Sequence, residues 1–193
     1  MSGKIVLVTG GARSGKSTFA ERYTAQLGKQ IAYIATAQIY DDEMKTRVDL
    51  HRSRRPADWA TYEAPYDSDV TLARIAPEVD AVLFDCLTLY TSNLLLAPDA
   101  PATPEERLEL IRSKITLLIK AVQSGRATVV FVTNEVGMGI VPDNALAREY
   151  RDVAGLVNQQ VAAAADEVYW VVSGLAVEIK KLATVLEGEV LHG

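Results

Sequence analysis

The stretch GGARSGKS, at positions 10–17, constrains the fold of this chain more than any other feature. It matches the pattern G-x-x-x-x-G-K-[ST] and comes directly after KIVLVTG (4–10), an apolar run rich in β-branched residues. The helical stretch STFAERYTAQLG (17–28) follows it and ends on a glycine. A strand, a glycine-rich loop and a helix in this order are typical of a phosphate-binding loop at the start of an α/β domain.

Short apolar strands and longer helical stretches alternate along the rest of the chain. The expected strands after the first are 30–37, 81–85, 128–133 and 168–174, and the expected further helices are 41–54, 105–125 and 144–167. Strands that are apolar on both faces, with helices between them, predict a parallel sheet joined by right-handed crossovers. The expected fold class is α/β, a P-loop NTPase-like (RecA-like) and mostly parallel sheet with helices on both faces.

Length and charge bound the remaining possibilities. A chain of 193 residues is long enough for one domain and short for two, so we expect a single domain over 1–193. The tail at 182–193 fits a final helical turn or a partner contact equally well. The net charge of -5 argues against nucleic acid as a partner, and no apolar stretch is long enough to span a membrane. The single cysteine, Cys86, excludes an internal disulfide framework, and with no signal peptide the expected location is cytoplasmic.

The residue types of the 10–17 stretch match the needs of a nucleotide triphosphate. Gly10 and Gly15 let the backbone curl so that successive N–H groups point at phosphate oxygens. Lys16 places a positive charge on the β- and γ-phosphates, and Ser17 offers a hydroxyl to Mg²⁺. The alternative, a glycine turn with an incidental lysine, does not explain why a strand and a helix flank the motif.

Polar residues follow two of the expected strands. Asp85 ends the run AVLFD, where a parallel strand would reach the carboxyl edge of the sheet, and a carboxylate there could hold the metal of a phosphate site. Its alternative role is that of a helix cap. Asn134 and Glu135 follow the strand at 128–133, and they form either a second wall of the site or an ordinary exit loop.

The stretch RVDLHRSRRP, at 47–56, packs four arginines around His51. Nearby positive charge disfavours the imidazolium form and pushes His51 towards neutrality. Three interpretations stay open on chemistry alone: a solvated basic helix end, a phosphate clamp with His51 as a hydrogen-bond donor, or a covalent nucleophile that attacks a nucleotide α-phosphate.

Five segments together resemble a known enzyme family. They are TGGARSGKS (9–17), IATAQIYDDEM (34–44), HRSRRPADW (51–59), VTNEVGMGIVPDN (132–144) and RDVAGLVNQQVAAAADEVYWVVSG (151–174). In this order they resemble the bifunctional adenosylcobinamide kinase/adenosylcobinamide-phosphate guanylyltransferases. The resemblance implies phosphorylation of adenosylcobinamide with ATP or GTP, then transfer of GMP from GTP to give adenosylcobinamide-GDP and pyrophosphate, with Mg²⁺ as cofactor. It also implies a small homo-oligomer, a trimer in the family's pattern.

The same resemblance implies roles for individual residues. From their chemistry, Lys16 is the expected catalytic residue of the kinase step and Ser17 and Asp85 are the expected metal ligands, whereas the resemblance implies that His51 becomes guanylylated. The nucleotide-binding residues that it implies are Gly10, Gly11, Ala12, Arg13, Ser14, Gly15, Lys16, Ser17, Ala35, Thr36, Ala37, Arg52, Ser53, Arg54, Arg55, Glu63 and Asp85. Two positions depart from the pattern, because Leu50 stands where some members have a second histidine and Asp85 where some have glutamate.

Two other functions remain as alternatives at this stage. A small-molecule P-loop kinase of another kind would transfer a γ-phosphate without a covalent intermediate. A RecA-like regulatory NTPase would hydrolyse nucleotide slowly and respond to a partner. The general base of the kinase step also stays open among Asp85, Asp41, Asp42 and Glu135.

Overall fold

The structure is a computed structural model that describes residues 2–38 and 56–184 of the chain. The sheet of the described residues has seven strands in the order β3-β2-β4-β5-β1-β6-β7. These strands are β1 (Lys4–Thr9), β2 (Ile31–Ala35), β3 (Ala60–Glu63), β4 (Ala81–Asp85), β5 (Thr128–Val132), β6 (Glu167–Val172) and β7 (Leu175–Glu178). The helical elements are α1 (Lys16–Thr24), α3 (Ser68–Ile75), α4 (Leu87–Leu95), α5 (Pro104–Ser124), α6 (Ala145–Ala164) and the 3₁₀ turn η1 (Lys180–Leu182).

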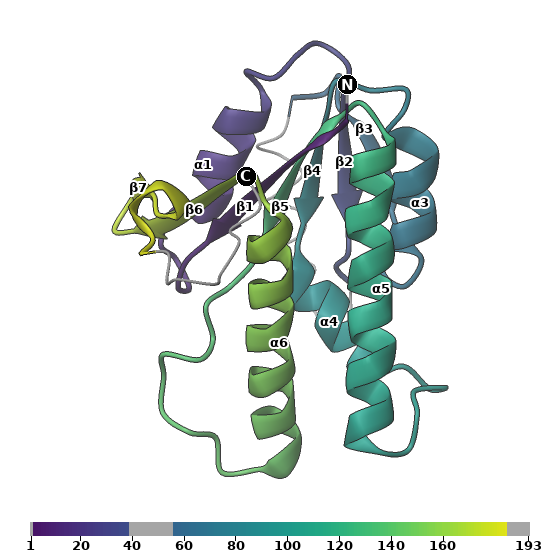
Figure 1. Cartoon of the computed structure of the whole chain (residues 1–193), viewed down its shortest axis with the longest axis vertical. Helices are drawn as coiled ribbons and strands as arrows, with labels where there is room; N and C mark the ends of the chain where they lie inside the picture. The colour runs from purple at the N-terminus through teal and green to yellow at the C-terminus, as the bar shows by residue number, and fades with distance from the viewer. Residues whose placement is uncertain (1, 39–55, 185–193) are drawn as a thin grey trace.

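The two faces of the sheet bury different sets of side chains. In β1, Ile5 and Leu7 pack into the core shared with α3, α4, α5 and α6, whereas Val6 and Val8 pack on the α1 side. This alternation follows from the two-residue period of a strand. Figure 1 shows α5 and α6 side by side across one face of the sheet. The sheet therefore carries helices on both faces, as the sequence predicts.

Strand directions also agree with the expectation. The pairs β3–β2, β2–β4, β4–β5, β5–β1 and β1–β6 are all parallel, and only β7 runs antiparallel, against β6. β5 separates the strand before the phosphate loop from the strand that ends in Asp85. This is the strand order expected of a RecA-like P-loop fold. Because parallel strands end at the same edge, residues that follow β1, β2, β4 and β5 gather along one side of the molecule.

The long helices begin at clear sequence signals. Thr103 accepts a hydrogen bond from the Glu106 N–H while Glu106 reaches back to Thr103, a capping box that starts α5. Asn144 accepts from the Ala147 N–H and starts α6.

Four elements were not predicted from the sequence: β3, α3, α4 and β7. The first two are only four and eight residues long. The sequence LTLYTSNLL of α4 has neither a side-chain cap at its start nor a charged residue.

The predicted strand 168–174 ends earlier, at Val172, because Ser173 and Gly174 turn the chain back into β7. The predicted helix 41–54 lies outside the described residues, as does the tail from 185 onwards. Of the described part of the tail, Leu182 belongs to η1. None of the described helices combines the length and the apolar character that a membrane span requires.

Candidate active site

The register of the parallel strands aligns the candidate residues along the carboxyl edge of the sheet. Ala35 pairs with Glu63 on one side and with Asp85 on the other, and Asp85 in turn pairs with Val132. Val132 pairs with Val8, two residues before the phosphate loop. Neighbouring strands lie about 4.8 Å apart, so the end of β4 is roughly 10 Å from β1, and the end of β3 is roughly 19 Å from it. Asp85 is thus close to the phosphate loop, and Glu63 lies at the far end of the same edge.

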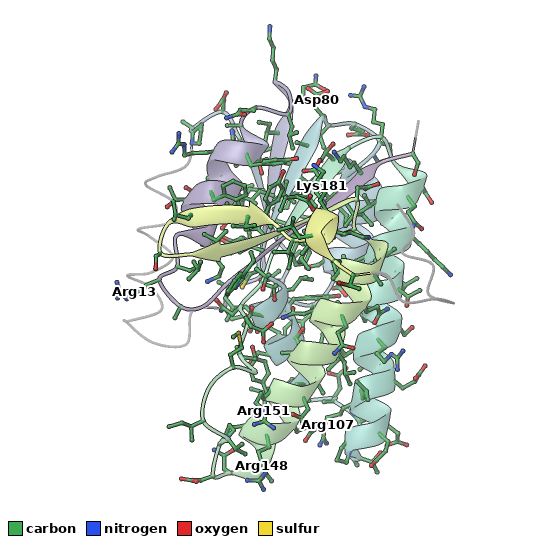
Figure 2. All side chains as sticks on the ribbon, turned by 60° about the vertical axis from the view of Figure 1, so that its left-hand side comes forward. Arg13, Asp80, Arg107, Arg148, Arg151 and Lys181 are labelled. Atoms are coloured by element: carbon green, nitrogen blue, oxygen red, sulfur yellow. The ribbon has the colours of Figure 1, made fainter. Side chains whose placement is uncertain are left out.

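The backbone of the phosphate loop depends on its glycines. Gly15 has a φ of 95°, which strains a residue with a side chain, and it leads directly into α1, whose Phe19 N–H donates to the Gly15 carbonyl. A Cβ added to Gly10 would lie 2.4 Å from the Val171 carbonyl oxygen, so no side chain fits there. Arg13, at the outer bend, also has a positive φ of 57°. Its side chain extends from the exposed part of the loop (Figure 2).

Lys16 is held beneath this loop. Its side chain is only 9% exposed, and its Nζ donates to the Gly11 carbonyl at 3.1 Å. Burial lowers the pKa of the Lys16 ammonium group, and the nearby Cys86 and Asp85 oppose that change. Phosphate oxygens bound by the curled backbone would stabilise the charged form of this buried ammonium group, because their negative charge offsets the loss of hydration. Ser17, the next residue, is half-buried in the first turn of α1.

Asp85 lies at the end of β4 with a tyrosine hydroxyl beside it. Tyr33 Oη donates to Asp85 Oδ2 at 2.7 Å, which orients the carboxylate. The peptide bond from Asp85 to Cys86 is cis. Burial raises the pKa of the Cys86 thiol to about 12, and the Asp85 charge adds to this effect. The thiol is therefore neutral at pH 7, and Cys86 serves as a small buried core residue.

Thr36 links the ends of β2 and β4. Its fully buried Oγ1 accepts from the Cys86 N–H at 2.7 Å and donates to the Cys86 carbonyl at 2.9 Å. Its own carbonyl accepts from Asn93 Nδ2 on α4. These bonds hold the backbone beside Asp85 in place. Thr36 therefore positions the end of β4 through its hydrogen bonds to Cys86. Ala35 and Ala37 flank it and are both half-buried.

The exit of β5 carries a second polar network. Asn158, on α6, accepts from Thr133 Oγ1 at 2.7 Å and donates from Nδ2 to the Asn134 carbonyl at 3.1 Å. The Asn134 N–H donates to Thr88 Oγ1 at 2.8 Å, and the buried Oδ1 of Asn134 has no hydrogen-bond partner among the described residues. The Glu135 N–H donates to the Gly10 carbonyl at 3.1 Å. The first residues after β5 are therefore joined directly to the phosphate loop.

The hairpin between β6 and β7 forms a further contact that the sequence analysis missed. Its two turn residues, Ser173 and Gly174, have positive φ values of 52° and 81°, and the Gly174 N–H donates to the Ser14 carbonyl at 2.8 Å. A Cβ on Gly15 would lie 3.1 Å from the Gly174 Cα. The dipeptide Ser-Gly after an apolar strand was a signal for the hairpin itself and not for its contact with Ser14, since positive φ at both positions is the signature of a tight hairpin.

Several predicted site residues lie outside the described residues. These are His51, Arg52, Ser53, Arg54 and Arg55, together with the base candidates Asp41 and Asp42. Among the residues that the structure brings together, Gly10 to Ser17, Ala35 to Ala37 and Asp85 share the edge, and the exposed Glu63 ends the neighbouring β3.

The residues near Lys16 suit a hard cation. Hydroxyl and carboxylate oxygens are the donors that Mg²⁺ prefers, and Ser17 and Asp85 supply one of each. No group of three or more metal-binding side chains occurs in the described part of the chain. In other phosphoryl-transfer sites, nucleotide phosphates and water supply the remaining ligands of the cation.

Comparison with known proteins identifies the family. The pattern of the family described as cobinamide kinase / cobinamide phosphate guanyltransferase matches residues 6–179. The chain belongs to this family. It is 50% identical over 182 residues to the bifunctional adenosylcobalamin biosynthesis protein CobU of Salmonella typhimurium, covering 91% of this chain and 99% of that protein. The CobU of Escherichia coli is 49% identical with the same coverage, and the bifunctional adenosylcobalamin biosynthesis protein CobP of Pseudomonas aeruginosa is 42% identical over 90% of this chain and 96% of its own length.

Family membership confirms the resemblance drawn from the five segments and the expected enzyme class, a kinase that is also a guanylyltransferase. It also agrees with the P-loop NTPase-like fold of the sheet.

Proposed function

We propose that this enzyme phosphorylates the aminopropanol hydroxyl of adenosylcobinamide and then transfers GMP from GTP to the new phosphate. The observation that carries the proposal is the carboxyl edge of the sheet in a chain of this family. There the phosphate loop with the buried Lys16 follows β1, and the oriented Asp85 ends β4, two strands away. Both reactions consume nucleoside triphosphates, and we place them in the cytoplasm for that reason.

In the kinase step, the acceptor hydroxyl oxygen forms a bond to the γ-phosphorus of ATP or GTP. The bond from the γ-phosphorus to the β–γ bridging oxygen breaks, and the nucleoside diphosphate leaves. The loop N–H groups and Lys16 offset the charge on the phosphate oxygens. Ser17 and Asp85 would hold Mg²⁺, which would supply further charge neutralisation. The hydroxyl proton passes to a carboxylate, for which Glu135 and Asp85 are the candidates among the described residues.

In the transferase step, we assign the nucleophile to His51. The neutral imidazole nitrogen attacks the α-phosphorus of GTP, a P–N bond forms, and pyrophosphate leaves. A phosphate oxygen of adenosylcobinamide phosphate then attacks the same phosphorus and breaks the P–N bond, which yields adenosylcobinamide-GDP and free His51. Arg52, Arg54 and Arg55 act as the triphosphate clamp. Ala35, Ala37 and Glu63 extend the nucleotide site along the β2–β3 part of the edge.

The test is to incubate the protein with Mg²⁺ and GTP labelled at the α-phosphate, with and without adenosylcobinamide, and to follow label on the protein and in products. The expected result is acid-labile label on wild-type protein, chased by adenosylcobinamide phosphate, and no label on His51→Ala. A Lys16→Ala variant is expected to lose phosphorylation of adenosylcobinamide. Label that persists on His51→Ala overturns the assignment of the nucleophile. γ-Phosphate transfer without any labelled protein supports a kinase of another kind instead.

The trimer implied by the resemblance stays a prediction. Sedimentation equilibrium of the purified protein tests it, because a trimer has three times the 21.0 kDa mass of the chain. The preference between ATP and GTP in the kinase step is tested by the ratio of kcat/KM for the two donors under the same conditions.

A further inference from the structure

The loop between β5 and α6 displays an unusual run of apolar side chains. Met138 is 78% exposed, Ile140 is 96% exposed and Val141 is 58% exposed. Single exposed apolar residues are ordinary on a protein surface, but three within four positions mark a surface that is covered in use. Glu135, at the start of this loop, is a candidate base for the kinase step, but an exposed apolar run has no part in proton transfer and needs a separate explanation.

Both ends of this loop are fixed, so the apolar run between them is held outward. At the start, the Glu135 N–H donates to the Gly10 carbonyl, and Glu135 Oε1 accepts from the Gly137 N–H at 3.0 Å. At the end, Arg148 on α6 donates from Nη1 to the carbonyls of Pro142 and Asp143, at 2.9 Å and 2.7 Å.

The middle of the loop lies clear of its surroundings. Gly139, between Met138 and Ile140, has open space where a side chain would stand. The loop runs beside α6 to the end of the helix that carries Arg148 (Figure 2). The apolar side chains therefore stand on an anchored frame and face away from the core.

The position of the loop connects it with the transfer site. The loop leaves the carboxyl edge from β5, the strand between β1 and β4, and Figure 1 shows it descending from that edge to the start of α6. The acceptor hydroxyl must come to the phosphates at this edge. A short arm carries this hydroxyl, and the macrocycle to which the arm is attached is many times larger than the arm. When the hydroxyl reaches the phosphates, the macrocycle must therefore contact the protein surface next to the edge.

We propose that Met138, Ile140 and Val141 form the docking surface for the corrin macrocycle of the acceptor. The proposal rests on the proposed function, because it takes adenosylcobinamide as the substrate. A corrin ring presents methyl groups and an apolar ring edge between its amide side chains, which suits apolar contacts spaced by polar backbone. Met138 adds an adaptable, polarisable contact for a ring of irregular outline. A nucleotide, by contrast, offers its phosphates to the edge and has no comparable apolar area for this loop.

The test compares the double variant Met138→Ser/Ile140→Ser with wild type, with Met138→Leu/Ile140→Leu as the conservative control. A second control is Leu117→Ser, which removes an apolar side chain that is 45% exposed on α5. Equilibrium dialysis measures adenosylcobinamide binding by its visible absorbance, independently of turnover. Steady-state kinetics then give KM for adenosylcobinamide and for ATP, and labelling with α-labelled GTP in the absence of corrinoid tests the transferase half alone.

The expected result for the serine double variant is a rise of about tenfold or more in Kd and KM for adenosylcobinamide, because apolar contact area is lost. Its KM for ATP and its labelling by GTP are expected to equal those of wild type, and both controls are expected to behave as wild type. Unchanged corrinoid binding in the serine variant overturns the proposal. So does a changed sedimentation mass with unchanged corrinoid binding, which assigns the loop to a subunit contact. If wild type itself does not phosphorylate adenosylcobinamide, the proposed function fails and the docking surface fails with it.

Discussion

The phosphate loop and the β5–α6 loop leave the same edge of the sheet but present opposite chemistry. The phosphate loop offers backbone N–H groups and the buried Lys16. Its shape depends on Gly10, where no side chain fits, and on Gly15, where a side chain would be strained. The β5–α6 loop offers apolar side chains, and its Gly139 stands in open space. The first recognises what all nucleoside triphosphates share, and the second is suited to what the acceptor alone provides. Because Glu135 bonds to Gly10, the two loops are joined at their base yet should be separable by substitution.

The largest effect is expected for Lys16→Ala. Loss of the ammonium group should lower kcat/KM of the kinase reaction by about 10³-fold, because charge on the transferring phosphate is no longer offset. Adenosylcobinamide binding, measured by equilibrium dialysis without nucleotide, should be unchanged. A parallel loss of corrinoid affinity would break the separation of the two loops.

Asp85→Asn should have the next largest effect. The amide keeps the size of the side chain and can still accept from the Tyr33 hydroxyl, but it lacks the charge that favours Mg²⁺. We expect kcat of the kinase reaction to fall by about 10²-fold and the Mg²⁺ concentration for half-maximal rate to rise. Tyr33→Phe is the matched control and should lose much less activity. Equal losses in the two variants would mean that the orientation of residue 85 matters more than its charge.

These two residues also mark how far the sequence could predict the site. The motif at 10–17 and the apolar run that ends in Asp85 are local patterns, so their strands and their shared edge could be inferred without coordinates. The contact from Gly174 to Ser14 and the bonds between Thr36 and Cys86 join residues far apart in the chain, and no local pattern encodes them.

The unpredicted elements have the same cause. The strand Ala60–Glu63 is short and mostly exposed, and pairing with β2 rather than its own sequence makes it a strand. The helix Leu87–Leu95 contains two β-branched threonines and no capping side chain, so packing of Leu87 and Tyr90 into the core decides its conformation. Local propensity specifies long, capped helices such as α5, and tertiary contacts specify the rest.

Two glycine substitutions, one in each loop, test whether the two loops act independently. Gly15→Ala should destabilise the protein by about 1–2 kcal/mol, because a side chain disfavours the left-handed backbone at φ 95°, and it should weaken ATP binding. Gly139→Ala should change the free energy of unfolding by no more than about 0.5 kcal/mol, since an added methyl group meets open space. Urea unfolding and ATP titration measure both variants. A loss of ATP affinity in Gly139→Ala would show that the β5–α6 loop shapes the phosphate site.

The smallest effect is expected at the opposite edge of the sheet, where Glu167 begins β6. Burial raises the pKa of Glu167, but hydrogen bonds from Lys4, Tyr23 and Tyr169 outweigh it and lower the pKa to about 2. A folded-state pKa below the unfolded value means that this carboxylate stabilises the fold above about pH 4.5 and loses its contribution as the pH falls towards 2.

Glu167→Gln should therefore cost about 1 kcal/mol of unfolding free energy near neutral pH, and the difference from wild type should shrink at about pH 3. Urea unfolding at the two pH values measures this. Because Glu167 is remote from both loops, neither the KM for ATP nor the KM for adenosylcobinamide should change at neutral pH. A shift in only one of these two KM values would mean that packing at the amino edge affects one loop and not the other. That result would separate the roles of the two loops more clearly than substitutions within the loops can. A shift in both would mean that the loops respond to the sheet as one unit, and their opposite chemistry would then no longer imply independent roles.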